Sequence, residues 1–191
     1  MNFGEPLRIA LEIVSLFEKN GINYMIIGSM ASSLFGIPRS TQDVDFIVSL
    51  EDRQIGPLCR KLEGIFYYSE SMIRDAVNRS GAFNIIHLET MFKADVFVAG
   101  KGSLSEAELK RRVPFHLKKS DSSPVYLASP EDIIVEKLVW YVKGNRISER
   151  QLNDVEGVIK IQKPNLDLEY LTVHALKRDV LDLLNQLLES E

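Results

Sequence analysis

Hydrophobic positions near the start of the chain change from helical spacing to short continuous runs. From Leu7 to Phe17 apolar residues recur three and four positions apart, and Gly21 follows them, as is typical of an amphipathic helix that ends at a glycine. Short apolar runs bounded by polar or turn residues then indicate buried strands. The pattern predicts four elements in order: helix 5–20, strand 23–27, helix 29–35 and strand 43–48.

The middle of the chain continues this alternation. After a helix over 51–62 and an irregular stretch over 65–80 with one helical piece, the runs 83–88 and 93–98 predict an antiparallel hairpin. A helix over 104–112 and an extended segment over 124–127 complete this part.

The last third of the chain is predicted to be entirely helical. Ser129-Pro130-Glu131-Asp132 combines an N-cap serine, a proline at the first helical position and acids in the first turn. The predicted helices are 130–142, 148–161 and two more that end near residue 188. We therefore expect an α+β fold with a small mixed sheet flanked by helices. Residues 1–128 would form the core, and residues 129–191 a helical C-terminal region packed on it.

Composition narrows the class of protein. The 191 residues are 45% hydrophobic, which suits one large globular domain or one domain with a helical appendage. A lone cysteine, the lack of a basic, apolar leader at the N-terminus and the lack of any apolar run near about 20 residues favour a cytoplasmic protein away from membranes. A net charge of −4 argues against a surface built for long duplex contact. Residues 101–122 hold a local basic surplus that could face a polyanion, although a solvated helix face is the simpler interpretation.

Three aspartates stand in two of the predicted strands. Asp43 and Asp45 are two apart and so share a strand face, about 7 Å from each other along the chain. Asp95 is a lone acid in the apolar part of the run 93–98, and a buried carboxylate is costly without a partner or a metal. If the two strands are neighbours, the three carboxylates converge in an arrangement suited to two Mg²⁺ ions, with Mn²⁺ as an alternative.

A candidate phosphate site precedes these acids. Gly28 and Ser29 stand where a predicted strand turns into a helix, where the glycine permits close approach and the helix N-terminus attracts anions. Arg39, in the following loop, is within plausible reach of phosphate oxygens. A Gly-Ser pair is usually only a turn and loop arginines are mostly solvated, so the combination with the acids carries the interpretation.

The three motifs together resemble a known signature. Gly28-Ser29, Asp43-Val44-Asp45 and Asp95 are similar to the motif of the nucleotidyltransferase superfamily that includes DNA polymerase β. They resemble more closely its minimal bacterial branch, which contains abortive-infection and toxin–antitoxin nucleotidyltransferases. The resemblance implies a polymerase-β-like fold over roughly residues 20–100. It also implies that Gly28 and Ser29 hold a triphosphate and that the three acids hold the metals. Asp95 would act as the general base or assist it.

The C-terminal half resembles the abortive-infection type, in which a lysine on one helix is followed by an aspartate on the next. Lys137 and Asp154 take these places. The resemblance implies that Lys137 contacts the triphosphate and that Asp154 orients Lys137 or the acceptor. The family pattern usually has Arg-Asp here, whereas Asn153 precedes Asp154 and Arg150 lies one turn back. The alternative gives neither residue a functional role. Lys137 would then extend from a packed helix to solvent, and Asp154 would lie on a solvated face.

The expected function is transfer of a nucleoside monophosphate from a metal-bound nucleoside triphosphate to an acceptor hydroxyl. The resemblance favours a tRNA 3′ end or a protein as acceptor, with an aminoglycoside as a third candidate, and suggests a toxin with a cognate antitoxin. The alternative is a catalytically inactive nucleotide-binding module or partner subunit with the same fold.

Overall fold

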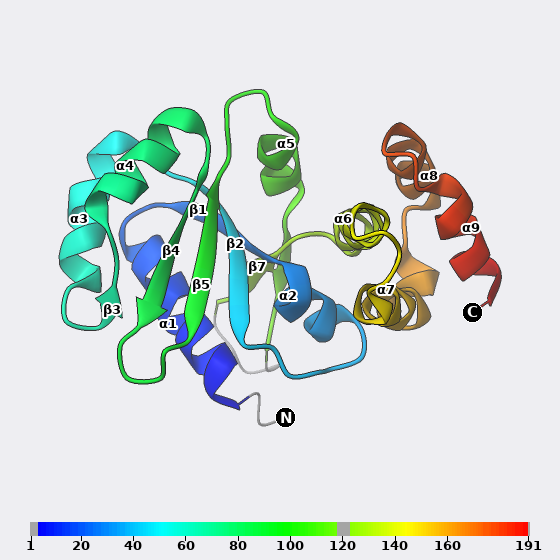
Figure 1. Ribbon diagram of the computed structural model, residues 1–191, viewed down its shortest axis with the longest axis horizontal. Coiled ribbons are helices and arrows are strands. Elements are labelled where there is room, and N and C mark those ends of the chain that lie inside the picture. Colours follow the sequence, from blue (N-terminus) through cyan, green and yellow to red (C-terminus); the bar gives the residue numbers. More distant parts are fainter. Residues whose placement is uncertain (1–3, 118–122, 191) are drawn as a thin grey trace. The chain divides into compact units, whose positions relative to one another are not determined.

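The computed structural model describes residues 4–117 and 123–190 (Figure 1). Contacts within the chain divide it into two compact units. The first unit combines the chain up to Ile27 with Thr41–Leu127, and the second combines Gly28–Ser40 with the chain from Ala128 onward. Residues 28–40 thus group with the C-terminal helices, whereas the sequence placed them in the 1–128 core. The predicted boundary between residues 128 and 129 stays a prediction. Lys118 and Lys119, which belong to the basic stretch, lie outside the described residues.

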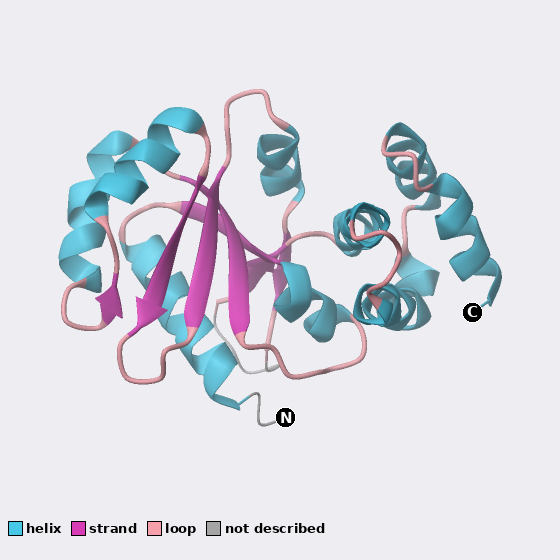
Figure 2. Ribbon diagram, in the orientation of Figure 1, coloured by secondary structure: helices cyan, strands magenta, loops and turns pink. Residues whose placement is uncertain are grey.

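The first unit is built on a mixed sheet, drawn in magenta in Figure 2. Its described strands follow the order β3 (Phe66–Tyr67), β4 (Ala82–His87), β5 (Lys93–Val98), β2 (Asp43–Ser49), β1 (Asn23–Ile27), β7 (Val125–Leu127) and β6 (Val113–Phe115). β2 runs parallel to β5 and β1 parallel to β7, while the other neighbours are antiparallel. The predicted hairpin of β4 and β5 and the predicted mixed sheet are confirmed.

Alternation along β2 gives the sheet two different faces. Val44, Phe46 and Val48 are fully buried. Phe46 meets Phe17 of helix α1 (Gly4–Lys19) in an edge-to-face contact with ring centroids 5.3 Å apart. Because successive side chains point to opposite faces, Asp43 and Asp45 lie on the face away from this contact. The other described helices of this unit are α3 (Asp52–Leu62), α4 (Glu70–Arg79) and α5 (Leu104–Arg111).

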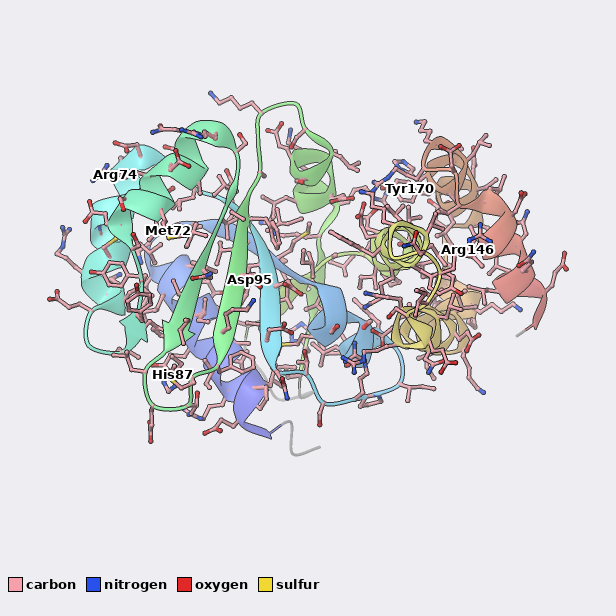
Figure 3. All side chains as sticks on the ribbon, viewed as in Figure 1. Met72, Arg74, His87, Asp95, Arg146 and Tyr170 are labelled. Carbon is pink, nitrogen blue, oxygen red and sulfur yellow. The ribbon has the colours of Figure 1, made fainter. Side chains whose placement is uncertain are left out.

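The second unit is helical. Its described elements are α2 (Gly28–Phe35), α6 (Pro130–Lys143), α7 (Glu149–Gln162), the 3₁₀ turn η1 (Lys163–Asn165), α8 (Leu168–Lys177) and α9 (Leu181–Ser190). The predicted start of α6 is confirmed, since the Ser129 side chain accepts a hydrogen bond from the Asp132 amide at 3.1 Å. Tyr170 of α8, labelled in Figure 3, donates a 2.6 Å hydrogen bond to Asp132 and so ties α8 to α6.

Helix α2 packs closely against α7 where α2 ends. A Cβ placed on Gly36 would lie only 2.7 Å from the carbonyl carbon of Gly157 and from the amide nitrogen of Val158. The two backbones therefore approach closely only because both positions are glycine. None of the described helices has both the length and the apolar character that crossing a membrane requires.

Candidate functional site

The three predicted acids share one face of the sheet in the first unit. Asp45 of β2 and Asp95 of β5 are direct partners in the parallel ladder, so their side chains point to the same side. Asp43 lies two residues before Asp45 on that side, and Figure 3 marks Asp95 on β5, beside β2. All three side chains are partly exposed. The adjacency of the two strands, on which the sequence argument depended, is confirmed.

Lys93 belongs to the same face, and the sequence analysis did not identify it. It stands two residues before Asp95 and opposite Asp43 in the ladder, and its Nζ lies 2.6 Å from Oδ2 of Asp95. The hydrogen bond to Asp95 raises the pKa of Lys93, burial opposes this change, and the negative charges of Asp95, Asp43 and Asp45 add to it. We name these four side chains the carboxylate face.

Asp43 also has a neighbour that holds it. The hydroxyl of Thr41 donates a 3.0 Å hydrogen bond to Oδ1 of Asp43, and the same hydroxyl lies 3.1 Å from the Asp43 carbonyl oxygen. Thr41 belongs to the polar loop predicted over residues 39–42, and this contact holds the carboxylate of Asp43 at the start of the strand.

The carboxylate face fits a divalent metal by its donor chemistry. Carboxylate oxygens are the ligands that Mg²⁺ prefers, and it usually takes only one or two of them from the protein. Within residues 4–117 and 123–190, no group of three or more His, Cys, Asp or Glu side chains is already gathered around a metal position. Asp43 is held by Thr41, and Asp95 by Lys93.

The second unit places Ser29 and Arg39 together. Gly28 has φ of 63°, in the left-handed region that glycine adopts without strain, and α2 begins at this residue. In the first turn of α2, the Ser29 hydroxyl accepts a 2.7 Å hydrogen bond from Nη2 of Arg39. Arg39 is thus held at the N-terminus of the helix, where backbone amides favour anions.

Asp154 of α7 joins Arg39 to Lys137 of α6. Nε and Nη2 of Arg39 donate to the two carboxylate oxygens of Asp154 at 2.6 and 2.7 Å. Nζ of Lys137 donates to Oδ2 of Asp154 at 2.7 Å and to the Gln151 side chain at 3.1 Å. The side chains of Lys137 and Asp154 are only 5% and 4% exposed. We name Ser29, Arg39, Lys137 and Asp154 the arginine–lysine cluster.

Electrostatics makes this cluster positive. Burial favours the neutral form of Asp154, but hydrogen bonds from Arg39 and Lys137 and their charges outweigh it and lower the pKa of the carboxyl group. Asp154 is therefore ionised at neutral pH. One carboxylate faces two cations, so these three side chains together carry one net positive charge.

These contacts contradict the solvent-exposed alternative that the sequence analysis gave for Lys137 and Asp154. Lys137 does not extend to solvent and Asp154 does not lie on a solvated face, since both are buried in one ion pair. Arg39 is only 26% exposed, and it donates hydrogen bonds to Asp154, to Ser29 and to the carbonyl oxygen of Ser40. Gln151, which the sequence analysis missed, lies three residues before Asp154 on the same helix, and helical spacing is the signal that could have found it.

Comparison of the sequence with protein families gives no match, and comparison with curated proteins gives none either. Solved structures do match. An antigenic nucleotidyltransferase-like protein from Paracoccidioides brasiliensis is 18% identical with a TM-score of 0.60, over 97% of this chain and 93% of its own.

The antibiotic-resistance factor ANT(2'')-Ia is also similar in structure. Its crystal structure in complex with adenylyl-2''-tobramycin is 14% identical with a TM-score of 0.59, over 90% of this chain and 95% of its own. Its solution structure is 13% identical with a TM-score of 0.57, over 96% of this chain and 97% of its own. At such identities the likeness concerns the fold, and this chain has the α+β fold of the nucleotidyltransferases.

Proposed function

We propose that this protein is a metal-dependent nucleotidyltransferase that moves a nucleoside monophosphate from a nucleoside triphosphate to an acceptor hydroxyl. The observation that carries the proposal is the pairing of Asp45 with Asp95 in the sheet, with Asp43 on the same face. Carboxylates that are close together and partly buried are unfavourable unless cations compensate them, and a metal–triphosphate complex supplies such cations.

The arginine–lysine cluster is the proposed triphosphate site. Gly28 lets the backbone approach the phosphates, and the hydroxyl of Ser29 adds a donor beside the amides that begin α2. Arg39 and Lys137 supply positive charge, and Asp154 fixes both of them through hydrogen bonds of 2.6 to 2.7 Å. Asp154 is therefore a positioning residue in this proposal.

The carboxylate face is the proposed metal site. Asp43, Asp45 and Asp95 would hold Mg²⁺, with two ions as the expected number and Mn²⁺ as a substitute. When bound, these ions lower the pKa of the attacking hydroxyl and stabilise the charge that develops on the phosphate oxygens. Asp95 is the residue proposed to accept, or help to accept, the proton of that hydroxyl.

In the proposed reaction the acceptor oxygen forms a bond to the α-phosphorus while the bond from the α-phosphorus to the pyrophosphate oxygen breaks. The hydroxyl proton leaves to a base, and pyrophosphate is released. The triphosphate contacts of Ser29, Arg39 and Lys137 hold the leaving group during this displacement, which is the positioning on which phosphoryl-transfer catalysis mainly depends.

The acceptor that we propose is a hydroxyl of RNA, with the 3′ end of tRNA as first choice, or of a protein. This choice follows from the resemblance to toxin-type nucleotidyltransferases, which also suggests a cytoplasmic toxin that a cognate antitoxin neutralises. An aminoglycoside hydroxyl is a second candidate, since ANT(2'')-Ia, which shares the fold, is found in complex with adenylyl-2''-tobramycin.

The test uses purified protein, Mg²⁺ and each of four α-labelled nucleoside triphosphates. Total tRNA, a cell lysate and an aminoglycoside are offered as acceptors, and the label is followed on RNA, protein and small molecules. The Asp43→Ala/Asp45→Ala variant is the inactive control. Asp75→Ala, which removes an exposed acid of α4 that pairs with Arg79, is the matched variant expected to keep activity.

Transfer by the wild type and by Asp75→Ala, but not by the double variant, would establish the activity and identify the acceptor class. Magnesium-dependent nucleotide binding without transfer to any acceptor would instead support the alternative of a nucleotide-binding module. Absence of both transfer and binding would overturn the proposal.

A further inference from the structure

Lys93 stands among three acids of the first unit. By comparison, Arg79 pairs with Asp75, and Lys110 pairs with Glu106, each across one helical turn. Lys93 is held on a strand, with Asp95 in contact and with the charges of Asp43 and Asp45 acting on it. One ammonium group thus partly compensates three carboxylates.

The position of Lys93 follows from the geometry of the sheet. Its side chain leaves β5 on the same side as Asp95 because the two residues are two apart, and Asp43 is its partner across the parallel ladder. The Nζ–Oδ2 distance of 2.6 Å is that of a strong, charge-assisted hydrogen bond. The carboxylate oxygen that Lys93 contacts is therefore one of those proposed to bind metal.

An ammonium group and a divalent metal ion both lower the repulsion among these acids, and they require the same oxygens. With Lys93 in place the four side chains carry a net charge of −2, from three carboxylates and one ammonium. Without the ammonium group of Lys93 the charge would be −3. The carboxylate face would then attract a divalent cation more strongly, and the metal-free protein would be less stable.

We propose that Lys93 is the resident counter-ion of the carboxylate face and competes with the divalent metal for Asp95. This inference rests on the proposed function, because it assumes that Asp43, Asp45 and Asp95 bind metal. In this role Lys93 stabilises the metal-free face and weakens the binding of metal that arrives without a nucleotide.

The experiment is a titration of the full chain with Mn²⁺ alone. The concentration of free Mn²⁺ is measured at each point by electron paramagnetic resonance. Four proteins are compared: wild type, Lys93→Met, Lys93→Arg and Lys110→Met. The first substitution keeps much of the aliphatic stem and removes the charge, and the second keeps the charge. Lys110→Met removes an exposed lysine that pairs with Glu106 one helical turn away and is the matched control.

We expect Lys93→Met to bind Mn²⁺ about five- to tenfold more tightly than wild type, as loss of one partly screened unit charge at contact distance requires. Lys93→Arg and Lys110→Met should bind as wild type does. A second readout is the melting temperature in the presence of a chelator, which should fall for Lys93→Met alone and recover when Mn²⁺ is added.

Other outcomes separate this inference from the proposed function. Equal or weaker Mn²⁺ binding by Lys93→Met, with clear binding by wild type, would overturn the counter-ion role and leave the metal site intact. Absence of Mn²⁺ binding by both wild type and Lys93→Met would overturn the metal site itself, and the inference with it.

Discussion

Asp154 holds a guanidinium and an ammonium group at once, and the two cations use its oxygens differently. Arg39 donates two hydrogen bonds, one to each oxygen, in the fork geometry that a planar guanidinium provides. Lys137 contacts Oδ2 alone, as a compact point charge does. Because Arg39 also reaches Ser29, the carboxylate of Asp154 determines where positive charge stands at the start of α2.

Replacement of Asp154 by asparagine tests this role. The amide has nearly the same shape but no charge, so Arg39 and Lys137 would lose the carboxylate that compensates them. We expect Asp154→Asn to lower the free energy of unfolding by about 3–5 kcal/mol, which is the cost of removing one charged partner from a buried ion pair. Urea denaturation at pH 7 measures this change. Asp75→Asn, in the exposed pair with Arg79, should cost less than about 1 kcal/mol.

The pH dependence gives a second view of the same prediction. Because the pKa of Asp154 is lowered in the folded protein, its contribution to stability is complete above the unfolded pKa, near 3.8, and is lost as the pH falls through the folded value. The stability difference between wild type and Asp154→Asn should therefore shrink below about pH 4. A difference that stayed constant from pH 7 to pH 3 would contradict the assignment of the effect to the charge of Asp154.

The acids could be predicted from the sequence to a large extent, but their partners could not. Strand alternation places Asp43 and Asp45 on one face, and the apolar context of Asp95 marked it as unusual. Lys93 obeys the same alternation, yet a lysine at the start of a strand is common, and only the three-dimensional structure places its ammonium group against Asp95. The pairing of Arg39 with Asp154 joins residues 115 positions apart, and no local pattern encodes it.

At the scale of elements, the periodic segments and the short strand β7 were predicted, whereas the short strands β3 and β6 were not. Helices α1, α3, α6 and α7 and strands β1, β2, β4 and β5 lie where apolar spacing indicated. β3 and β6 have two and three residues, too few for a period to be visible, and they exist through pairing with β4 and β7. The helical piece expected within 65–80 is α4, whose start is capped by Ser69.

The contact between α2 and α7 gives the prediction at this scale. At Gly36 a methyl group would meet the backbone of Gly157 and Val158 at 2.7 Å, and backbone atoms cannot rotate away as a side chain can. We expect Gly36→Ala to force the elements apart and to lower the free energy of unfolding by about 1–3 kcal/mol. Triphosphate affinity should fall as well, because Arg39 follows three residues later and must reach both Ser29 and Asp154.

Thermal and urea denaturation, with nucleotide titration, measure both effects. Gly81→Ala is the matched control, because a Cβ there would make an ordinary contact of 3.7 Å with Ala76, and its effect should be small. If Gly36→Ala were as stable as Gly81→Ala, the close approach of the two backbones would have no energetic role.

At the scale of the whole chain, the second unit is discontinuous in sequence. Its first segment is Gly28–Ser40 and its second begins at Ala128, so the chain leaves the sheet after β1, forms α2, and returns to the sheet before β2. An eight-residue helix is too short to be stable alone in water. α2 therefore owes its stability to packing on α6 and α7, which lie more than 90 positions later.

A fragment that ends at residue 128 tests this dependence. It contains every described strand but lacks α6 and α7, the helices against which α2 packs in the whole chain. In the fragment, we expect amides of α2 to exchange with solvent at nearly the rate of an unfolded peptide. In the full chain they should exchange slowly, as measured by hydrogen exchange and mass spectrometry.

Amides of β2 and β5, whose ladder lies wholly within the first unit, should remain the better protected part and serve as the internal control. Protection of α2 in the fragment equal to that in the full chain would show that α2 belongs to the 1–128 core, as the sequence alone predicted.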